Sequence, residues 1–172
     1  MARLEVPVQL RWSDMDAYAH VNNVEMLRLL EEARIEAFWR HPAGPDGERP
    51  EPSTPTAVLD AGPGTTVSTF VAHQEIQYVK PLGYRRAPVV VEMWVGHLGG
   101  ASLDVCYQVR DLPAADPASV VYARAVTTLV LVDASGAPTR IGPHERAAWS
   151  VLLEEPVQIR RRGGGAGSGA RG

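Results

Sequence analysis

The chain has 172 residues, of which 45% are hydrophobic and 22% charged, and its formal net charge is -3. These values are typical of one globular domain with a sizeable core, and the small negative charge gives no reason to expect nucleic acid as a partner. With a single cysteine, Cys106, no internal disulfide can form, which fits a reducing compartment. The first residues lack a basic region followed by an apolar stretch, and no apolar run reaches the ~18 residues of a membrane span. We therefore expect a cytoplasmic protein without a membrane span.

A strand and a long helix are expected first along the chain. Apolar and polar residues alternate from Leu4 to Trp12, which is the period of a strand with one buried face. Pro7 lacks an N–H, so this strand is expected at a sheet edge or to contain a bulge. Helical spacing follows from Val24 to Trp39, with apolar side chains on one face and charged ones on another. Asn22 or Asn23 is suited to cap this helix, because its side-chain oxygen can accept an amide hydrogen that the first turn leaves unpaired.

The rest of the chain predicts a loop and then strands. The stretch from His41 to Thr66 is rich in Pro, Gly, Ser and Thr, which predicts a long loop. Four strand-like segments come after it: Phe70 to Val79, Pro88 to Leu98, Ala101 to Arg110 and Ser119 to Val132. Short links between them, including the hairpin signal Gly99-Gly100, favour a meander. A short helix over His144 to Leu153 is expected to close the domain.

This order of elements predicts an α+β fold, in which the long helix packs across the concave side of a curved antiparallel sheet. The predicted domain covers residues 1–155 and includes the long loop at 41–66. The remaining residues, 156–172, are almost all Arg, Gly and Ala towards the end of the chain. We expect this tail to be disordered, because it has little apolar surface to bury.

A dense polar cluster lies between the first strand and the long helix, and it contains Asp14, Asp16, His20, Asn22 and Asn23. A helix N-terminus offers unpaired N–H groups and a positive dipole end, which can polarise a carbonyl and stabilise an oxyanion during acyl transfer. A carboxylate beside it can activate water as a general base or attack the carbonyl itself. The same residues could instead only cap the helix and shape the turn, since Asx residues favour such positions.

Other side chains with chemical potential form no recognisable site. The histidines and Cys106 lack metal-ligand spacing, and no glycine-rich phosphate loop opens a helix, so neither a metal nor another cofactor is expected. Glu32 shares a helix face with other charged residues and is expected in solvent. Glu31 lies nearer the apolar stripe, where pairing with Arg34 is a simpler role for it than catalysis.

Two pairs of segments resemble the hydroxybenzoyl-CoA thioesterase-like family. The stretch Arg11-Trp-Ser-Asp-Met-Asp16-Ala-Tyr-Ala-His20-Val-Asn-Asn-Val24 and the following Leu30-Glu-Glu-Ala-Arg34 resemble its opening. Glu75-Ile-Gln-Tyr-Val-Lys-Pro-Leu82 and Val121-Tyr-Ala-Arg-Ala-Val126 resemble its second half. The resemblance implies a hotdog fold, with a curved antiparallel sheet wrapped around one long helix. It also implies a homodimer or a homotetramer built from two dimers, with active sites at subunit interfaces.

The same resemblance implies hydrolysis of an acyl-CoA thioester to a carboxylic acid and CoA, without a cofactor. The second aspartate of the family's Asp-x-Asp pattern falls on Asp16, which would act as general base or nucleophile, and Asp14 would support it. The backbone N–H that polarises the thioester carbonyl falls at the helix start, near Asn23 and Val24. Because CoA carries phosphates, basic residues are expected at the mouth of the site. The candidates are Lys80, Arg85 and Arg86.

His20 is the second catalytic candidate. The segment from His20 to Asn23 is also similar to plant acyl-acyl-carrier-protein thioesterases, in which an Asp, an Asn and a His act together. Asp16 and His20 match two of those residues, but Tyr18 stands in place of the Asn, so that triad is incomplete. Ala19 stands where the thioesterase family commonly has glycine. If the turn requires positive φ there, alanine strains it, which affects the placement of His20 more than that of Asp16.

Two alternative functions stay open at this point. In the first, the acyl group is carried by an acyl carrier protein instead of CoA. In the second, the domain binds acyl-CoA without turnover, as a sensor. A hotdog hydratase is disfavoured, because its Asp-x-Asn-Pro-x-His signature is missing.

Overall fold

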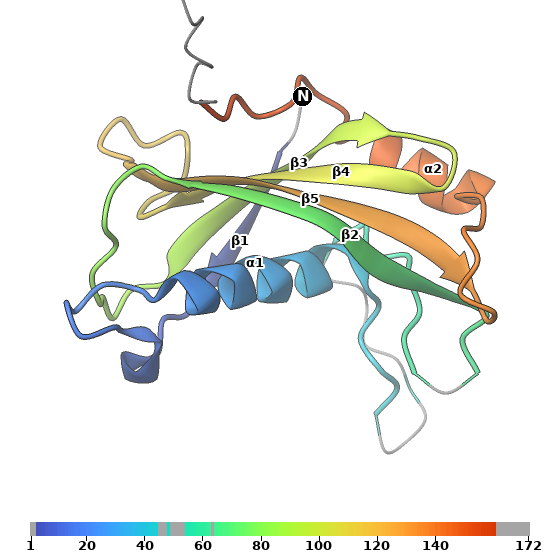
Figure 1. The fold of residues 1–172 in the computed structure, drawn as a ribbon, viewed down its shortest axis with the longest axis horizontal. Coiled ribbons are helices and arrows are strands. Elements are labelled where there is room, and N and C mark those ends of the chain that lie inside the picture. Colours follow the sequence, from blue (N-terminus) through green and yellow to red (C-terminus); the bar gives the residue numbers. More distant parts are fainter. Residues whose placement is uncertain (1–2, 45–47, 49–53, 63, 161–172) are drawn as a thin grey trace, which may run out of the picture.

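Five strands form one antiparallel sheet in the order β1-β3-β4-β5-β2, in a computed structural model that describes residues 3–44, 48, 54–62 and 64–160. The elements are β1 (Leu4–Val8), η1 (Trp12–Asp14, a 3-10 helix), α1 (Asn23–Phe38), β2 (Val67–Tyr78), β3 (Val89–Leu98), β4 (Ser102–Arg110), β5 (Val121–Asp133) and α2 (Pro143–Ser150). The sheet curves around α1, which lies across its concave face (Figure 1). The predicted α+β hotdog architecture is confirmed.

The strand order differs from the predicted meander. β3, β4 and β5 follow one another through short links, but β2 pairs with β5 at one edge of the sheet, and β1 lies beside β3 at the other. The link between Tyr78 and Val89 therefore passes β5 and β4 to reach the far side. The prediction is wrong for β2, because alternation along a strand identifies its buried face and not its neighbour.

The first strand is shorter than its sequence pattern. β1 ends at Val8, and Leu10 is still buried at 2% exposure, but the chain then turns into η1. Trp12 begins this 3-10 turn and is 74% exposed. The expectation that Trp12 continues the buried alternation is wrong, since the threefold turn of a 3-10 helix interrupts the twofold period of a strand.

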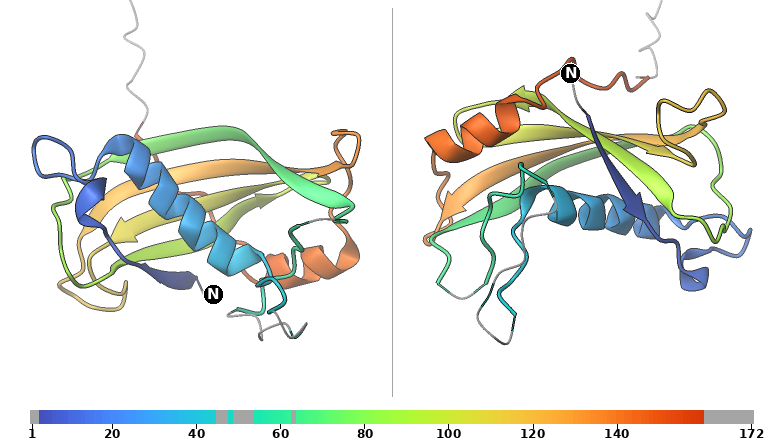
Figure 2. Two further views of the ribbon diagram at one scale, coloured as in Figure 1. Left: turned by 90° about the horizontal axis from the view of Figure 1, so that it is seen from below. Right: turned by 180° about the vertical axis from the view of Figure 1, so that it is seen from behind.

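α1 holds the core together. Its inward face is fully buried against the sheet and consists of Met26, Leu29, Leu30, Ala33, Ala37 and Phe38. Figure 2 shows the helix lying across the strands, with α2 near its C-terminal end. Its outward face carries charged residues, and Arg28 forms an ion pair with the exposed Glu32 there. None of the described helices is long and apolar enough to cross a membrane.

Part of the predicted long loop is packed. Residues Thr56, Ala57, Val58 and Leu59 are buried, and the indole of Trp149 in α2 donates a hydrogen bond to the Thr56 carbonyl at 3.1 Å. The Thr56 hydroxyl also donates to the Ala37 carbonyl at 2.7 Å, and the Leu59 N–H donates to the Phe38 carbonyl at 2.9 Å. The segment before β2 is therefore tied both to α2 and to the C-terminal end of α1. Residues 45–47, 49–53 and 63 of the predicted loop lie outside the described residues.

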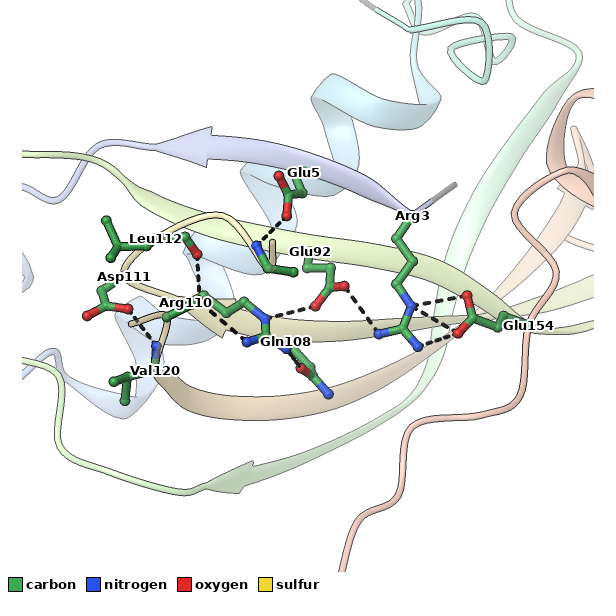
Figure 3. A network of polar contacts seen from close by, with 11 residues as sticks. Arg3, Glu5, Glu92, Gln108, Arg110, Asp111, Leu112, Val120 and Glu154 are labelled. Atoms are coloured by element: carbon green, nitrogen blue, oxygen red, sulfur yellow. Dashed lines mark hydrogen bonds and ion pairs between the residues drawn. The ribbon is translucent and has the colours of Figure 1, made fainter. Parts of the chain in front are cut away.

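The convex face of the sheet carries a polar network (Figure 3). Buried Glu92 of β3 pairs with Arg3 at 3.2 Å and with Arg110 of β4 at 2.9 Å. Arg3 also pairs with Glu154, lowering the pKa of that carboxyl through its hydrogen bonds, and lies 3.8 Å over the ring of Trp94. The network fastens the segment after α2 to the start of the chain.

The chain continues along this face beyond the predicted domain boundary at 155. The Trp94 indole donates to the Glu155 carbonyl at 2.9 Å, and the Val157 N–H points at the sulfur of Cys106, 3.5 Å away. Cys106 is fully buried beneath this segment, and burial raises the pKa of its thiol. The rest of the predicted tail, residues 161–172, lies outside the described residues.

Candidate active site

The loop between η1 and α1 folds around the carboxylate of Asp16. Oδ1 of Asp16 accepts two backbone hydrogen bonds, from the N–H of Tyr18 at 2.8 Å and from the N–H of His20 at 3.1 Å. The Asp16 N–H in turn donates to the His20 carbonyl at 2.7 Å. Among the described residues, no donor reaches Oδ2. One oxygen of this half-buried carboxylate therefore holds the turn, and the other is available for chemistry.

The turn needs a left-handed residue at Ala19, whose φ is 61°. The positive φ considered for this position, where the family commonly has glycine, is confirmed. Because alanine has a Cβ, this backbone conformation costs about 1 kcal/mol. His20 follows directly and is exposed, and its backbone forms an isolated bridge with Gly83. His20 thus meets Asp16 through its N–H, and the part of the chain that the structure describes shows no hydrogen bond to its imidazole.

The N-terminus of α1 ends the loop, with Asn22 as the N-cap. Its side-chain oxygen accepts the N–H of Val24 at 2.9 Å, so that donor is occupied. The N–H of Asn23, the first helical residue, meets no acceptor among the described residues. The Tyr78 hydroxyl of β2 donates to the Asn23 carbonyl at 3.2 Å, and burial raises the pKa of that hydroxyl. Of the two predicted positions, Asn23 offers an open N–H, whereas Val24 offers an exposed side chain.

Asp14 lies beneath this loop, fully buried. Its carboxylate accepts from the backbone and side chain of Arg11 at 2.7 and 2.8 Å and lies 3.0 Å from the guanidinium of Arg28. Burial by itself would raise the pKa of Asp14, but the hydrogen bonds from Arg11 and the charges of Arg28 and Arg11 outweigh it. The pKa of Asp14 is therefore lowered. These contacts suit a residue that supports the loop.

Asp14→Asn is expected to lower the free energy of unfolding by about 2 kcal/mol at pH 7, because the variant leaves Arg11 and Arg28 without their buried anion. Since the folded-state pKa lies below the unfolded one, the ionic contribution is complete above the unfolded value of about 3.9 and is lost as pH falls through the folded pKa. Urea unfolding of both proteins from pH 7 to pH 3 should show the gap closing below about pH 4. A gap that stays constant over that range would contradict the ionic role.

The link between β2 and β3, residues 79–88, is fastened against the Asp16 loop. The Val21 N–H donates to the Leu82 carbonyl at 2.8 Å, and the Gln9 side chain donates to the Arg86 carbonyl at 2.9 Å. Both segments lie at the end of the molecule opposite α2, the blue loop and the green link in Figure 1. The fold therefore brings the predicted basic turn beside the Asp16 loop.

The three basic candidates of this turn differ in their surroundings. Arg85 lies 3.9 Å from Asp111 and is turned towards the link between β4 and β5. Lys80 and Arg86 are exposed, and among the described residues no carboxylate pairs with either. The geometry thus leaves Lys80 and Arg86 available for an anionic ligand and engages Arg85 elsewhere.

An apolar groove runs between α1 and β2, which sequence reasoning missed. Its larger pocket has a volume of about 400 Å³, and its lining includes Ile35, Trp39, Thr69, Val71 and Leu129. A second pocket of about 280 Å³ extends it to Val24 at the helix start. The groove could have been predicted from Ile35, an apolar residue that lies off the buried stripe of α1 and is exposed. The groove therefore starts beside the Asp16 loop.

Arg34 is the buried polar residue of this groove, and Glu31, Arg40 and His41 also line it. Arg34 is 4% exposed and donates from Nη1 to the hydroxyl of Tyr107 at 3.1 Å, and burial raises the pKa of that hydroxyl. Glu31 lies 3.9 Å from Arg34, the pairing that their spacing predicted, and its side chain is exposed. Among the described residues, no three His, Cys, Asp or Glu side chains are grouped as a metal site.

Comparisons with known proteins agree on one family. The sequence profile of the thioesterase-like superfamily matches residues 10–152. The PA2801 protein of Pseudomonas aeruginosa, a proposed thioesterase, has a similar structure, with a TM-score of 0.64 and 29% identity over 84% of this chain and 95% of that one. A comparison with curated protein sequences gave no match.

Two further solved structures share the fold. A proposed acyl-CoA thioesterase from Xanthomonas campestris has a TM-score of 0.59 and 25% identity over 80% of this chain and 98% of that one. A thioesterase of Bacillus stearothermophilus, assigned by prediction, has a TM-score of 0.66 and 20% identity over 91% of this chain and all of that one. The profile covers well over half of the chain, and the resemblance noted in the sequence is confirmed. The chain belongs to the thioesterase-like superfamily and is a thioester hydrolase of the hotdog fold.

Proposed function

We propose that the protein hydrolyses an acyl-CoA thioester to a carboxylic acid and CoA. The observation that carries this proposal is the pair of unused groups in one loop, Oδ2 of Asp16 and the N–H of Asn23. In the folded loop, Oδ1 of Asp16 and the N–H of Val24 form hydrogen bonds, whereas Oδ2 of Asp16 and the N–H of Asn23 form none with the described residues. A carboxylate oxygen beside a helix N-terminus is the combination that acyl transfer to water requires.

The proposed reaction begins with the thioester carbonyl oxygen accepting the N–H of Asn23. This hydrogen bond and the positive end of α1 stabilise the oxyanion as water, deprotonated by Oδ2 of Asp16, attacks the carbonyl carbon. The intermediate then collapses, the C–S bond breaks, and the CoA thiolate leaves and takes up the proton that Asp16 removed from water. In the covalent variant Oδ2 itself attacks, and water cleaves the resulting anhydride. His20 is the second candidate, as an exposed proton carrier on the same turn.

The groove beside α1 supports an apolar acyl group. It extends from Val24 to Trp39, a span of about 22 Å at the rise of an α-helix. Apolar walls would remove an acyl chain from water, and the groove opens at the end where the carbonyl would be polarised. An acyl chain of several carbons would bury more surface there than acetate, so we expect longer chains to be preferred.

A thiol-trapping assay over short, medium, long and aromatic acyl-CoAs tests this function. We expect one thiol and one carboxylic acid for each thioester consumed, with rates that rise from acetyl to longer acyl groups. The same acyl groups attached to an acyl carrier protein are assayed in parallel. Faster turnover of these substrates than of the acyl-CoAs would make the carrier protein, and not CoA, the proposed acyl carrier. Binding of every acyl-CoA without thiol release would instead identify a sensor.

We further propose that two copies pair through β2. This edge strand has 12 residues, and its outer backbone edge has no partner strand within the described chain. Phe70 on its convex side is 62% exposed, and Val71 in the groove is 39% exposed. A long unpaired edge strand with exposed apolar side chains is a template for another strand, and the groove beside it would gain a wall from the second copy.

Val71→Asp is therefore expected to give a monomer with at least tenfold lower kcat/KM, because a carboxylate would be buried in the pairing region. Light scattering with size-exclusion chromatography measures the mass. Val151→Asp is the matched control, since Val151 is 63% exposed on the last turn after α2, away from β2. A Val71 variant that keeps the mass and activity of the wild type would rule out this interface.

A further inference from the structure

An exposed aromatic pair borders the Asp16 loop. Trp12 of η1 is 74% exposed, and Tyr84 of the link between β2 and β3 is 40% exposed. Their ring centroids are 5.1 Å apart, and their planes meet at 78°. Two rings in this arrangement form a corner, so a flat ring that stacks on one face meets the edge of the other.

The corner is held in place from both sides. The Trp12 segment belongs to the loop whose Asp14 is buried between Arg11 and Arg28. The Tyr84 segment is fastened by the Val21 to Leu82 hydrogen bond and by the bridge between His20 and Gly83. Large exposed aromatic rings on a rigid support favour a binding role, because little conformational freedom is lost when a ligand arrives.

The charges around the corner indicate an anionic ligand. Lys80 and Arg86 lie in the same link as Tyr84, both exposed and without a carboxylate partner among the described residues. Arg11, in contrast, is occupied by Asp14 and Glu25. An aromatic surface beside unpaired basic side chains matches a base joined to phosphates.

We infer that Trp12 and Tyr84 form a stacking site for the adenine ring of CoA, with Arg86 and Lys80 binding its phosphates. The inference rests on the proposed function, because it assigns the nucleotide end of the same substrate. Four peptide units separate Trp12 from Asp16, so their Cα atoms lie within about 14 Å. The adenine lies at the far end of the pantetheine arm from the thioester, which suits a site at the outer end of the Asp16 loop.

Kinetics on a full and a truncated substrate test the site. With one acyl group on CoA and on N-acetylcysteamine, Trp12→Leu should raise the KM for the CoA thioester about tenfold, the typical loss for one stacked base. The KM for the truncated thioester, which has no adenine, should not change. Trp12→Phe keeps a ring and should restore most of the affinity. Equal losses on both substrates, or a changed oligomeric mass, would overturn the inference and give Trp12 a structural role.

A charge variant and its control complete the experiment. Arg86→Ala should raise the KM for the CoA thioester at low salt and lose this effect at high salt. Arg140→Ala removes an exposed arginine next to Ile141, whose N–H bonds to Gly100 in the hairpin at the far end of β3, and should change nothing. Equal effects of Arg86→Ala and Arg140→Ala would show that only overall charge matters and would overturn the phosphate assignment.

Binding of free CoA separates a failure of this inference from a failure of the proposed function. Trp94 and Trp149 are buried and Trp39 is half-buried, so Trp12 is the indole most open to a ligand. CoA should quench the tryptophan emission in a saturable way, and Trp12→Phe should abolish the change even if no thioester is hydrolysed. Quenching that persists in Trp12→Phe, or no quenching of the wild type at concentrations that inhibit turnover, would place the adenine elsewhere.

Discussion

Asp16→Asn is expected to lower kcat by about 10²–10⁴-fold, the usual contribution of a positioned general base. An amide cannot take a proton from water or attack a carbonyl under these conditions. The amide oxygen can still accept the N–H groups of Tyr18 and His20, which now bind Oδ1 of the carboxylate. The substitution therefore removes the proposed chemistry and keeps the turn.

Two controls give this result its meaning. Thermal unfolding of Asp16→Asn should match the wild type, whereas Asp16→Ala, which also removes the acceptor for both amides, should lose about 1 kcal/mol. Asp14→Asn alters stability and leaves the proposed base in position, so its activity at saturating substrate should fall less. A near-normal kcat for Asp16→Asn would remove Asp16 from the mechanism.

Asn23→Pro is expected to lower kcat by about 10²–10³-fold, since it deletes the one N–H proposed to bind the oxyanion. The backbone allows this change. Asn23 is the first residue of α1, a position that proline favours because its missing N–H has no intrahelical partner. Asn22 has φ -60° and ψ 143°, the extended conformation required before proline. Helix and cap should therefore survive.

Asn23→Ala is the matched control. It removes the exposed side chain of Asn23 and keeps the N–H, so kcat should stay within a few-fold of the wild type. If the proline and alanine variants lose activity equally, the side chain or the packing of the helix start is responsible. If the proline variant keeps its activity, the oxyanion is stabilised by another group.

The sequence predicted the elements well, because each has a local cause. The apolar spacing of α1 predicted Val24 to Trp39, and the helix runs from Asn23 to Phe38. Alternation in β4 came out as predicted, with Leu103 and Tyr107 facing the core, except that Cys106 on the opposite face is also buried. The position of β2 beside β5 could not be predicted in this way, since it depends on pairing between segments far apart in the chain.

In the candidate site, too, the features that depend on local sequence could be predicted and those that depend on long-range packing could not. Asp16, His20 and Asn23 are near in sequence, so the motif alone placed them in one loop. The contact of the basic turn with that loop, and the diversion of Arg85 to Asp111, arise from long-range packing. Trp12 illustrates the limit most clearly. Its alternation predicted a buried side chain, and η1 exposes it beside Tyr84.

Titration of Asp16→Asn with an intact acyl-CoA tests the central claim most directly. The assignment of Asp16 to chemistry and of the groove along α1 to binding predicts that the variant binds with an affinity close to that of the wild type. It also predicts that the variant leaves the thioester intact while the wild type releases CoA. Thiol release by the variant at the wild-type rate would contradict the account.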